Sequence, residues 1–112
     1  MINYSDFENV DIRVGTVIEA KLNKKSKNPS LYLLIDFGKK IGQKKTSAQL
    51  TKYYLPNELL GKQVAAVINF PPKQIGKMIS EVLVLGFPDD DNNQVLVMPY
   101  IKITNGGKLF LV

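Results

Sequence analysis

The sequence predicts an all-β domain, a closed five-stranded Greek-key barrel with one or two short helices and an extension at each end. Three observations favour this fold class. Short apolar strands recur at regular spacing along the 112 residues, a single segment with helical character follows the third strand, and glycines mark the bends. The length suits one domain and is too short for two, so we expect residues 1–112 to form a single domain.

A helical turn and a long strand are expected first. Residues Ser5 to Glu8 fit a capping box, which predicts a short helix at the start of the chain. Apolar residues then alternate with others from Ile12 to Leu22, and this period of two predicts a long strand with one mainly apolar face. Gly15 within that strand indicates a bulge or a tight bend, as when a strand curls into a barrel.

The only helical potential after the first strand lies in residues 50–60. Pro56 stands at a helix start and Gly61 just past its end. Tyr53 and Tyr54 are expected to pack this helix and not to offer a stacking surface. The segments before it are a polar basic loop at 23–30, a second strand at 31–37, a glycine-bounded turn at 38–42 and a polar third strand at 43–49.

The second half of the chain continues the strand pattern. A buried strand at 64–68 ends at Asn69, because the pair Pro71-Pro72 cannot continue a ladder. The expected segments after it are a basic loop at 73–79, an apolar strand at 81–87, its hairpin partner at 94–98, a turn at 105–107 and a last strand at 108–112. This order predicts an OB-fold. Such barrels bind ligands on one strand face and through the loops after strands one and four, here 23–30 and 70–80.

Positive charge is concentrated in the middle of the chain. Residues 21–77 hold twelve lysines against Asp36 and Glu58, whereas both flanking segments are net acidic. The block favours a polyanion or an acidic protein surface as partner, and a merely solvated surface is the alternative. Fourteen of the fifteen cations are lysine, which suits phosphates better than the bidentate reading of bases.

Residues that are missing exclude several classes of chemistry. The chain has no His and no Cys, so it lacks the nucleophile–base relays and the Cys/His zinc sites of many enzymes. The Asp89–Asp91 run lacks the spacing of a calcium loop and is expected to be a solvated hairpin tip. We therefore expect no enzyme, no metal and no cofactor. The lack of cysteine, of a signal-peptide pattern and of a long apolar run favours a cytoplasmic protein without a membrane span.

The third strand and the loops around it supply the candidate ligand groove. Lys44 and Lys45 point to opposite faces, and Ser47 and Gln49 share the face of Lys45. Lys45 is expected to contact an acidic group while Ser47 and Gln49 offer hydrogen bonds, although both polar residues could instead satisfy the barrel's own backbone.

Other groove candidates follow this strand, and each has a structural alternative. Asn69 and Pro71 either line the groove or only end the strand and fix the turn. Glu81 is expected to hold a lysine or to bind a basic peptide. The remaining candidates are Lys73, Lys77 and Ser80 in the groove, and Lys24, Lys25 and Lys27 in the basic loop.

Both ends of the chain are apolar. Ile2, Tyr4 and Phe7 stand at one end, and Leu109, Phe110 and Leu111 at the other. A symmetric dimer interface is the first interpretation, and packing of the ends against the barrel is the alternative.

Several ordered motifs resemble the tRNA-binding OB-fold domain family, with a match over about residues 7–112. The motifs are Phe7 to Gly15, Ile35 to Gly38, Lys44 to Thr51, Asn69 to Pro72 and Ser80 to Gly86. The chain is most similar to the CsaA branch of that family, a group of export-related chaperones. It departs from relatives at Ile79, where a basic residue is usual, and at Lys73, where arginine is common.

The resemblance implies a homodimer formed by elements at the chain ends, and two kinds of ligand. Similarity to the export chaperones implies binding of unfolded or export-precursor polypeptides, together with tRNA. The alternative function is a tRNA-binding module that grips the RNA backbone through a basic groove. A free-standing domain is expected in either case.

Overall fold

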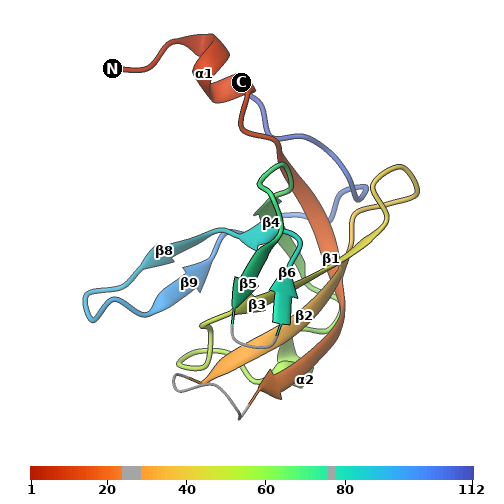
Figure 1. The fold of residues 1–112 in the computed structure, drawn as a ribbon, viewed down its shortest axis with the longest axis vertical. Coiled ribbons are helices and arrows are strands. Elements are labelled where there is room, and N and C mark those ends of the chain that lie inside the picture. Colours follow the sequence, from red (N-terminus) through yellow and green to blue (C-terminus); the bar gives the residue numbers. More distant parts are fainter. Residues whose placement is uncertain (24–28, 76–77) are drawn as a thin grey trace.

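A five-stranded antiparallel sheet, curled into a half-barrel, dominates the computed structural model, which describes residues 1–23, 29–75 and 78–112 (Figure 1). The strand order is β3-β2-β1-β4-β7, and the pairs β5-β6 and β8-β9 form two small hairpins. The fold class predicted from the sequence is confirmed. The elements are α1 (Tyr4–Glu8), β1 (Ile12–Asn23), β2 (Ser30–Asp36), β3 (Gln43–Ala48), α2 (Pro56–Leu59), β4 (Gln63–Val67), β5 (Lys73–Ile75), β6 (Met78–Ser80), β7 (Leu83–Val84), β8 (Gly86–Pro88) and β9 (Gln94–Leu96).

Strand β1 belongs to both halves of the curled sheet. Its first part pairs with β4 from Ile12 to Thr16, and its second part pairs with β2 from Thr16 to Asn23. The register shifts between Val17 and Glu19, which increases the local bend of the strand. The bulge that the sequence placed at Gly15 therefore lies a few residues further on.

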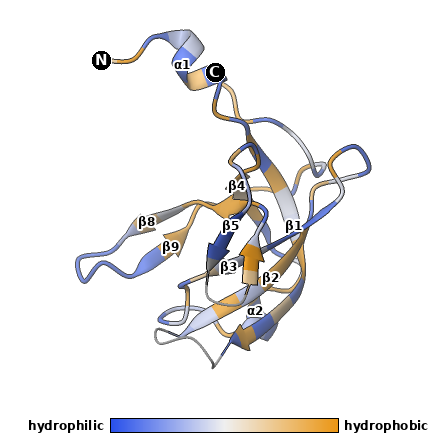
Figure 2. Cartoon of the chain, viewed as in Figure 1, coloured by the Kyte–Doolittle hydropathy of each residue, from blue (hydrophilic) through white to orange (hydrophobic). Residues whose placement is uncertain are grey.

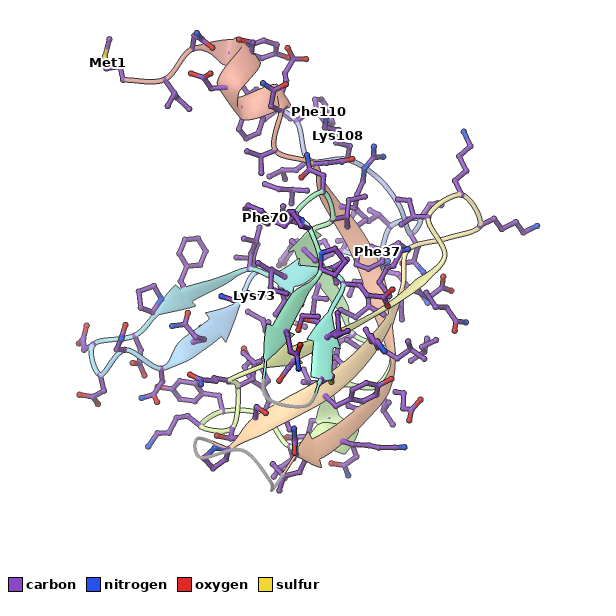
Figure 3. All side chains as sticks on the ribbon, viewed as in Figure 1. Met1, Phe37, Phe70, Lys73, Lys108 and Phe110 are labelled. Atoms are coloured by element: carbon purple, nitrogen blue, oxygen red, sulfur yellow. The ribbon has the colours of Figure 1, made fainter. Side chains whose placement is uncertain are left out.

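Gly15 has a different role, because it lets β1 approach the core closely. A Cβ atom at this position would lie 2.6 Å from Cγ2 of Ile35 and 2.8 Å from Cδ1 of Phe37, so only glycine fits without displacing them. Phe37 is buried in the centre of the molecule (Figure 3). The buried core consists of Val17, Leu31, Leu33, Ile35, Phe37, Leu50, Leu59, Val64, Ala66, Val82 and Leu96, and β4 stands out as hydrophobic in Figure 2.

Both helices are short, and one differs from expectation in its start. Asn3, and not Ser5, caps α1: its side chain accepts from the N–H of Asp6 at 2.9 Å, and the Asp6 carboxylate accepts from the N–H of Asn3 at 3.1 Å. Helix α2 begins at Pro56 as predicted. No helix of the described residues is long and apolar enough to cross a bilayer.

Three segments of the second half differ from the sequence-based expectation. The expected basic loop at 73–79 contains the hairpin strands β5 and β6. The expected strand at 81–87 is divided into β7, which pairs with β4, and β8, which pairs with β9. The expected last strand at 108–112 is reduced to an isolated bridge between Arg13 and Lys108. In each case the segment has too few consecutive ladder partners to form one regular strand.

The C-terminal segment nevertheless runs beside the start of β1. The N–H of Gly106 donates to the carbonyl of Val14 at 2.8 Å, and the N–H of Leu109 donates to the carbonyl of Ile12 at the same distance. Lys108 reaches back to the carbonyl of Glu8 at 3.0 Å. Consequently both chain ends lie together at one end of the molecule (Figure 1).

Candidate functional site

Strand β3 carries the predicted lysines at its surface. Lys45 is exposed, Lys44 is half-buried, and Gln49 is exposed just beyond the end of the strand. Thr46 between them is fully buried in the core. Lys44, Lys45 and Gln49 are therefore accessible to a ligand, as the groove hypothesis requires.

Ser47 and Ser80 are engaged inside the protein. The N–H of Ser47 donates to Oγ of Ser80 at 2.9 Å, and its hydroxyl donates to Oγ of Ser30 at 3.3 Å. All three serines are buried. The geometry therefore favours the structural interpretation of Ser47 and Ser80, in which their polar groups satisfy the barrel.

Glu81 also helps to close the barrel. Its N–H donates to the carbonyl of Lys45 at 2.9 Å, and its Oε1 accepts from the N–H of Lys45 at 3.1 Å. Among the described residues the ion pairs are Arg13–Asp11 and Lys21–Glu19, so the expected pair of Glu81 with Lys73 is not formed. The carboxylate binds a main-chain amide and not a lysine side chain.

Asn69 ties the end of β4 to the start of β1. Its Oδ1 accepts from the N–H of Asp11 at 3.0 Å, and its Nδ2 donates to the carbonyl of Asn9 at 2.7 Å. These bonds fix the position of the loop that carries Phe70 and Pro71. Asn69 thus acts in the structure, whereas Pro71 is exposed.

The loop beyond Asn69 presents an aromatic side chain that the sequence-based interpretation missed. Phe70 is 53% exposed and lies on the same side of the molecule as Lys73, which is also exposed (Figure 3). An aromatic residue beside two prolines was read only as part of a turn, although an apolar side chain in a polar loop could have marked it. Lys24, Lys25, Lys27 and Lys77 lie outside the described residues.

The β8–β9 hairpin is anchored at its tip by Asp89. Its side chain accepts from the N–H groups of Asp91 at 2.9 Å and Asn93 at 2.8 Å, and from the hydroxyl of Tyr53. The bond from Tyr53 is the main cause that lowers the pKa of Asp89, and it raises the pKa of Tyr53 in turn. Within the described residues, no group of three or more acidic side chains is placed to hold a metal ion.

Neither tyrosine of the 50–60 segment lies in a helix. Tyr53 is in a turn before α2, and the hydroxyl of Tyr54 accepts from the N–H of Leu96 at 2.9 Å. The expectation of helix packing is therefore wrong. Both side chains instead attach the β3–α2 connection to the β8–β9 hairpin.

The apolar chain ends remain largely open to solvent. Ile2, Tyr4, Leu109, Phe110 and Leu111 are all exposed, and Phe7 is half-buried. Phe110 lies near α1 (Figure 3) and lines a mostly apolar hollow of about 400 Å³ together with Val14 and Ile103. Packing against this chain's own barrel leaves these side chains mostly uncovered.

Comparison with solved structures shows close similarity over almost the whole chain. The crystal structure of chaperone CsaA from Bacillus anthracis strain Ames has a TM-score of 0.93 and 44% sequence identity, covering 98% of this chain and 99% of that one. The CsaA chaperone protein of Picrophilus torridus has a TM-score of 0.89 and 45% identity, with coverage of 98% and 100%.

Comparison with curated sequences identifies longer relatives. Methionine–tRNA ligases of Porphyromonas gingivalis and Pyrococcus horikoshii are 34% and 36% identical over 96% of this chain. The chain spans only 15% and 14% of their length, so the similarity concerns one domain of these enzymes. The family described as "Putative tRNA binding domain" matches residues 12–108. The chain belongs to this tRNA-binding domain family and has the fold of the CsaA chaperones.

Proposed function

We propose that this protein is a non-catalytic binding protein that holds unfolded or export-precursor polypeptides in a chaperone-like manner. The observation that carries the proposal is the similarity to two CsaA chaperone structures, which extends over 98% of the chain at 44% and 45% identity. Exposed apolar side chains at the chain ends and at Phe70 support it, because clustered apolar surface is what an unfolded polypeptide contacts.

Binding of tRNA is the second candidate function, and the family match favours it. Lys45 and Lys73 are exposed on elements beside the groove, where lysines can neutralise phosphates without reading bases. Each neutralised phosphate releases counterions, so binding of tRNA would weaken steeply as salt rises.

The proposal includes a homodimer and a cytoplasmic location. Two copies that join through Phe110 and its apolar neighbours would cover side chains that one copy leaves exposed. The absence of cysteine from the sequence supports a reducing compartment.

A salt series separates the two ligand classes. The affinities of the protein for bulk tRNA and for a reduced, permanently unfolded secretory precursor are measured from low to high salt, in the parent and in a Lys44→Glu, Lys45→Glu variant. Polypeptide binding is expected to persist at moderate salt, whereas tRNA binding falls with both salt and charge reversal.

Two results would contradict these assignments. Failure of the parent to bind either ligand would refute both functions. If tRNA binds equally well to the charge-reversed variant, Lys44 and Lys45 are not part of an RNA surface.

A further inference from the structure

Three surface hollows are arranged in a continuous line across the molecule. The first, of about 540 Å³, lies between Phe70, Lys73 and Leu83. The second, of about 180 Å³, lies between the end of β3 and β7, and Leu83 is part of its wall as well. Because Leu83 borders both hollows, the first opens directly towards the second.

The third hollow continues the line on the other side. It has a volume of about 310 Å³ and is lined by Lys52, Thr51 and Asn93. Gln49 and Gln94 line both this hollow and the middle one. The three hollows together therefore form one track, which we call the β3–β7 track.

The middle of the track is aliphatic. Leu50 and Leu96 are buried at its base, and Val84 and Leu85 form one wall. Its volume is below the roughly 300 Å³ at which small-molecule pockets begin, so it suits one apolar side chain of a longer ligand. An anchor of this kind commonly supplies much of the affinity in a protein interface.

Each end of the track carries a lysine. Lys73 lies at the Phe70 end and Lys52 at the Asn93 end, and both are exposed. Of the described residues that line the three hollows, none is acidic. A complementary ligand therefore places negative charge on both sides of its apolar anchor.

The lining of the middle hollow discriminates between polypeptide and RNA. Unpaired bases bind proteins by stacking on aromatic rings or on arginine guanidinium groups. The described residues around the middle hollow include neither an aromatic residue nor an arginine. An aliphatic side chain fits this lining better than a base does.

We propose that the β3–β7 track binds an extended polypeptide segment whose central apolar residue is flanked on both sides by acidic residues. The apolar side chain enters the middle hollow, and the flanking carboxylates lie at Lys52 and Lys73. This inference rests on the proposed polypeptide-binding function and adds the location and the sequence preference of the site.

A charge-swap experiment tests the track. Fluorescence anisotropy is measured with three synthetic peptides: a leucine centre flanked by glutamates, the same centre flanked by lysines, and a serine centre flanked by glutamates. An oligouridine of similar length is the RNA probe. The proteins are the parent, Lys52→Glu, Lys73→Glu, the double variant, and Lys39→Glu as the control, because Lys39 is exposed in the 38–42 turn outside the track.

The parent is expected to bind the glutamate-flanked leucine peptide most tightly. Each reversal at Lys52 or Lys73 should weaken this binding about fivefold, and the double variant should prefer the lysine-flanked peptide. Such a reversal of preference also proves that the double variant is folded. Lys39→Glu should leave the ranking and the affinity almost unchanged.

Other outcomes overturn the inference. An equal loss in Lys39→Glu would show that only overall charge matters, and an unchanged preference in the double variant would exclude the two lysines. If Lys52 and Lys73 affect only the oligouridine, the track binds RNA. If the unfolded precursor binds the parent but no peptide depends on these lysines, the proposed function stands and the track assignment fails, whereas loss of all polypeptide binding refutes both.

Discussion

The N–H of Ser47 donates to Oγ of Ser80 across 2.9 Å, so a side chain joins β3 to the end of β6 where a barrel would otherwise need a strand ladder. Glu81 adds two further bonds to the main chain of Lys45 beside it. A serine and a glutamate therefore close the half-barrel.

Replacement of Ser80 by alanine should destabilise the protein by about 1–3 kcal/mol, because the buried N–H of Ser47 loses its partner. Urea unfolding monitored by circular dichroism measures the change. Ser5→Ala is the control, since the hydroxyl of Ser5 makes an exposed bond in α1, and its effect should stay within about 0.5 kcal/mol. Equal stability of the two variants would contradict the closing role.

Gly15→Ala should cost about 1–3 kcal/mol, because the new methyl group overlaps Ile35 and Phe37 in a packed core. Gly107→Ala is a matched control, because a Cβ atom there would lie 3.8 Å from Cγ1 of Val14, an ordinary contact. Thermal unfolding of both variants gives the comparison. A fully stable Gly15→Ala protein would show that β1 does not need this close approach.

Asn69→Ala removes both bonds that hold the main chain on either side of Val10. The expected loss is about 1–2 kcal/mol, and the amide of Asp11 should exchange its hydrogen faster. Hydrogen exchange followed by NMR measures the rate, with Asn57→Ala as a control at an exposed position in α2. An unchanged rate at Asp11 would mean that Asn69 does not hold this segment.

The pair Tyr53–Asp89 predicts a pH dependence at acid pH. The pKa of Asp89 is lowered from its ordinary value of 3.8, mainly by the bond from Tyr53. A carboxyl with a lowered pKa stabilises the folded state above that ordinary value, and the contribution is lost as the pH falls through the lowered pKa. NMR titration of the carboxyl carbon should show the pKa of Asp89 rising in Tyr53→Phe. No rise would exclude Tyr53 as the cause.

Phe110→Glu tests the proposed dimer. Phe110 is 70% exposed in one copy, and a charge there would be buried without a partner if two copies met at the chain ends. Sedimentation velocity should give a dimer for the parent and a monomer for the variant. Phe87→Glu alters an exposed residue of the β8–β9 hairpin and should remain dimeric. A monomeric parent would refute the interface.

Long alternating segments made the fold predictable, and short or side-chain-mediated ones did not. The period of two in β1 and β2 is long enough to indicate strands. By contrast, β5, β6 and β8 have only three residues each, which is too short for alternation to be visible. The C-terminal apolar run resembled a strand, but only Lys108 in it forms a bridge.

The candidate site was predictable in charge and less so in geometry. Lys45, Gln49 and Lys73 are exposed as a ligand surface requires. Ser47 looked equally available, yet Ser80 uses its N–H, and sequence spacing cannot reveal a bond between residues so far apart. The β3–β7 track could not be predicted for the same reason, because three separate segments must fold together before its hollows exist.

Pairing of the C-terminal segment with β1 has a consequence for synthesis of the protein. The N–H of Leu109 bonds the carbonyl of Ile12, so the earliest strand acquires its final neighbour only when almost the whole chain has been translated. A nascent chain of this kind emerges from the ribosome with an unsatisfied strand edge and completes its fold late. It is therefore most exposed to association with other nascent chains just before release.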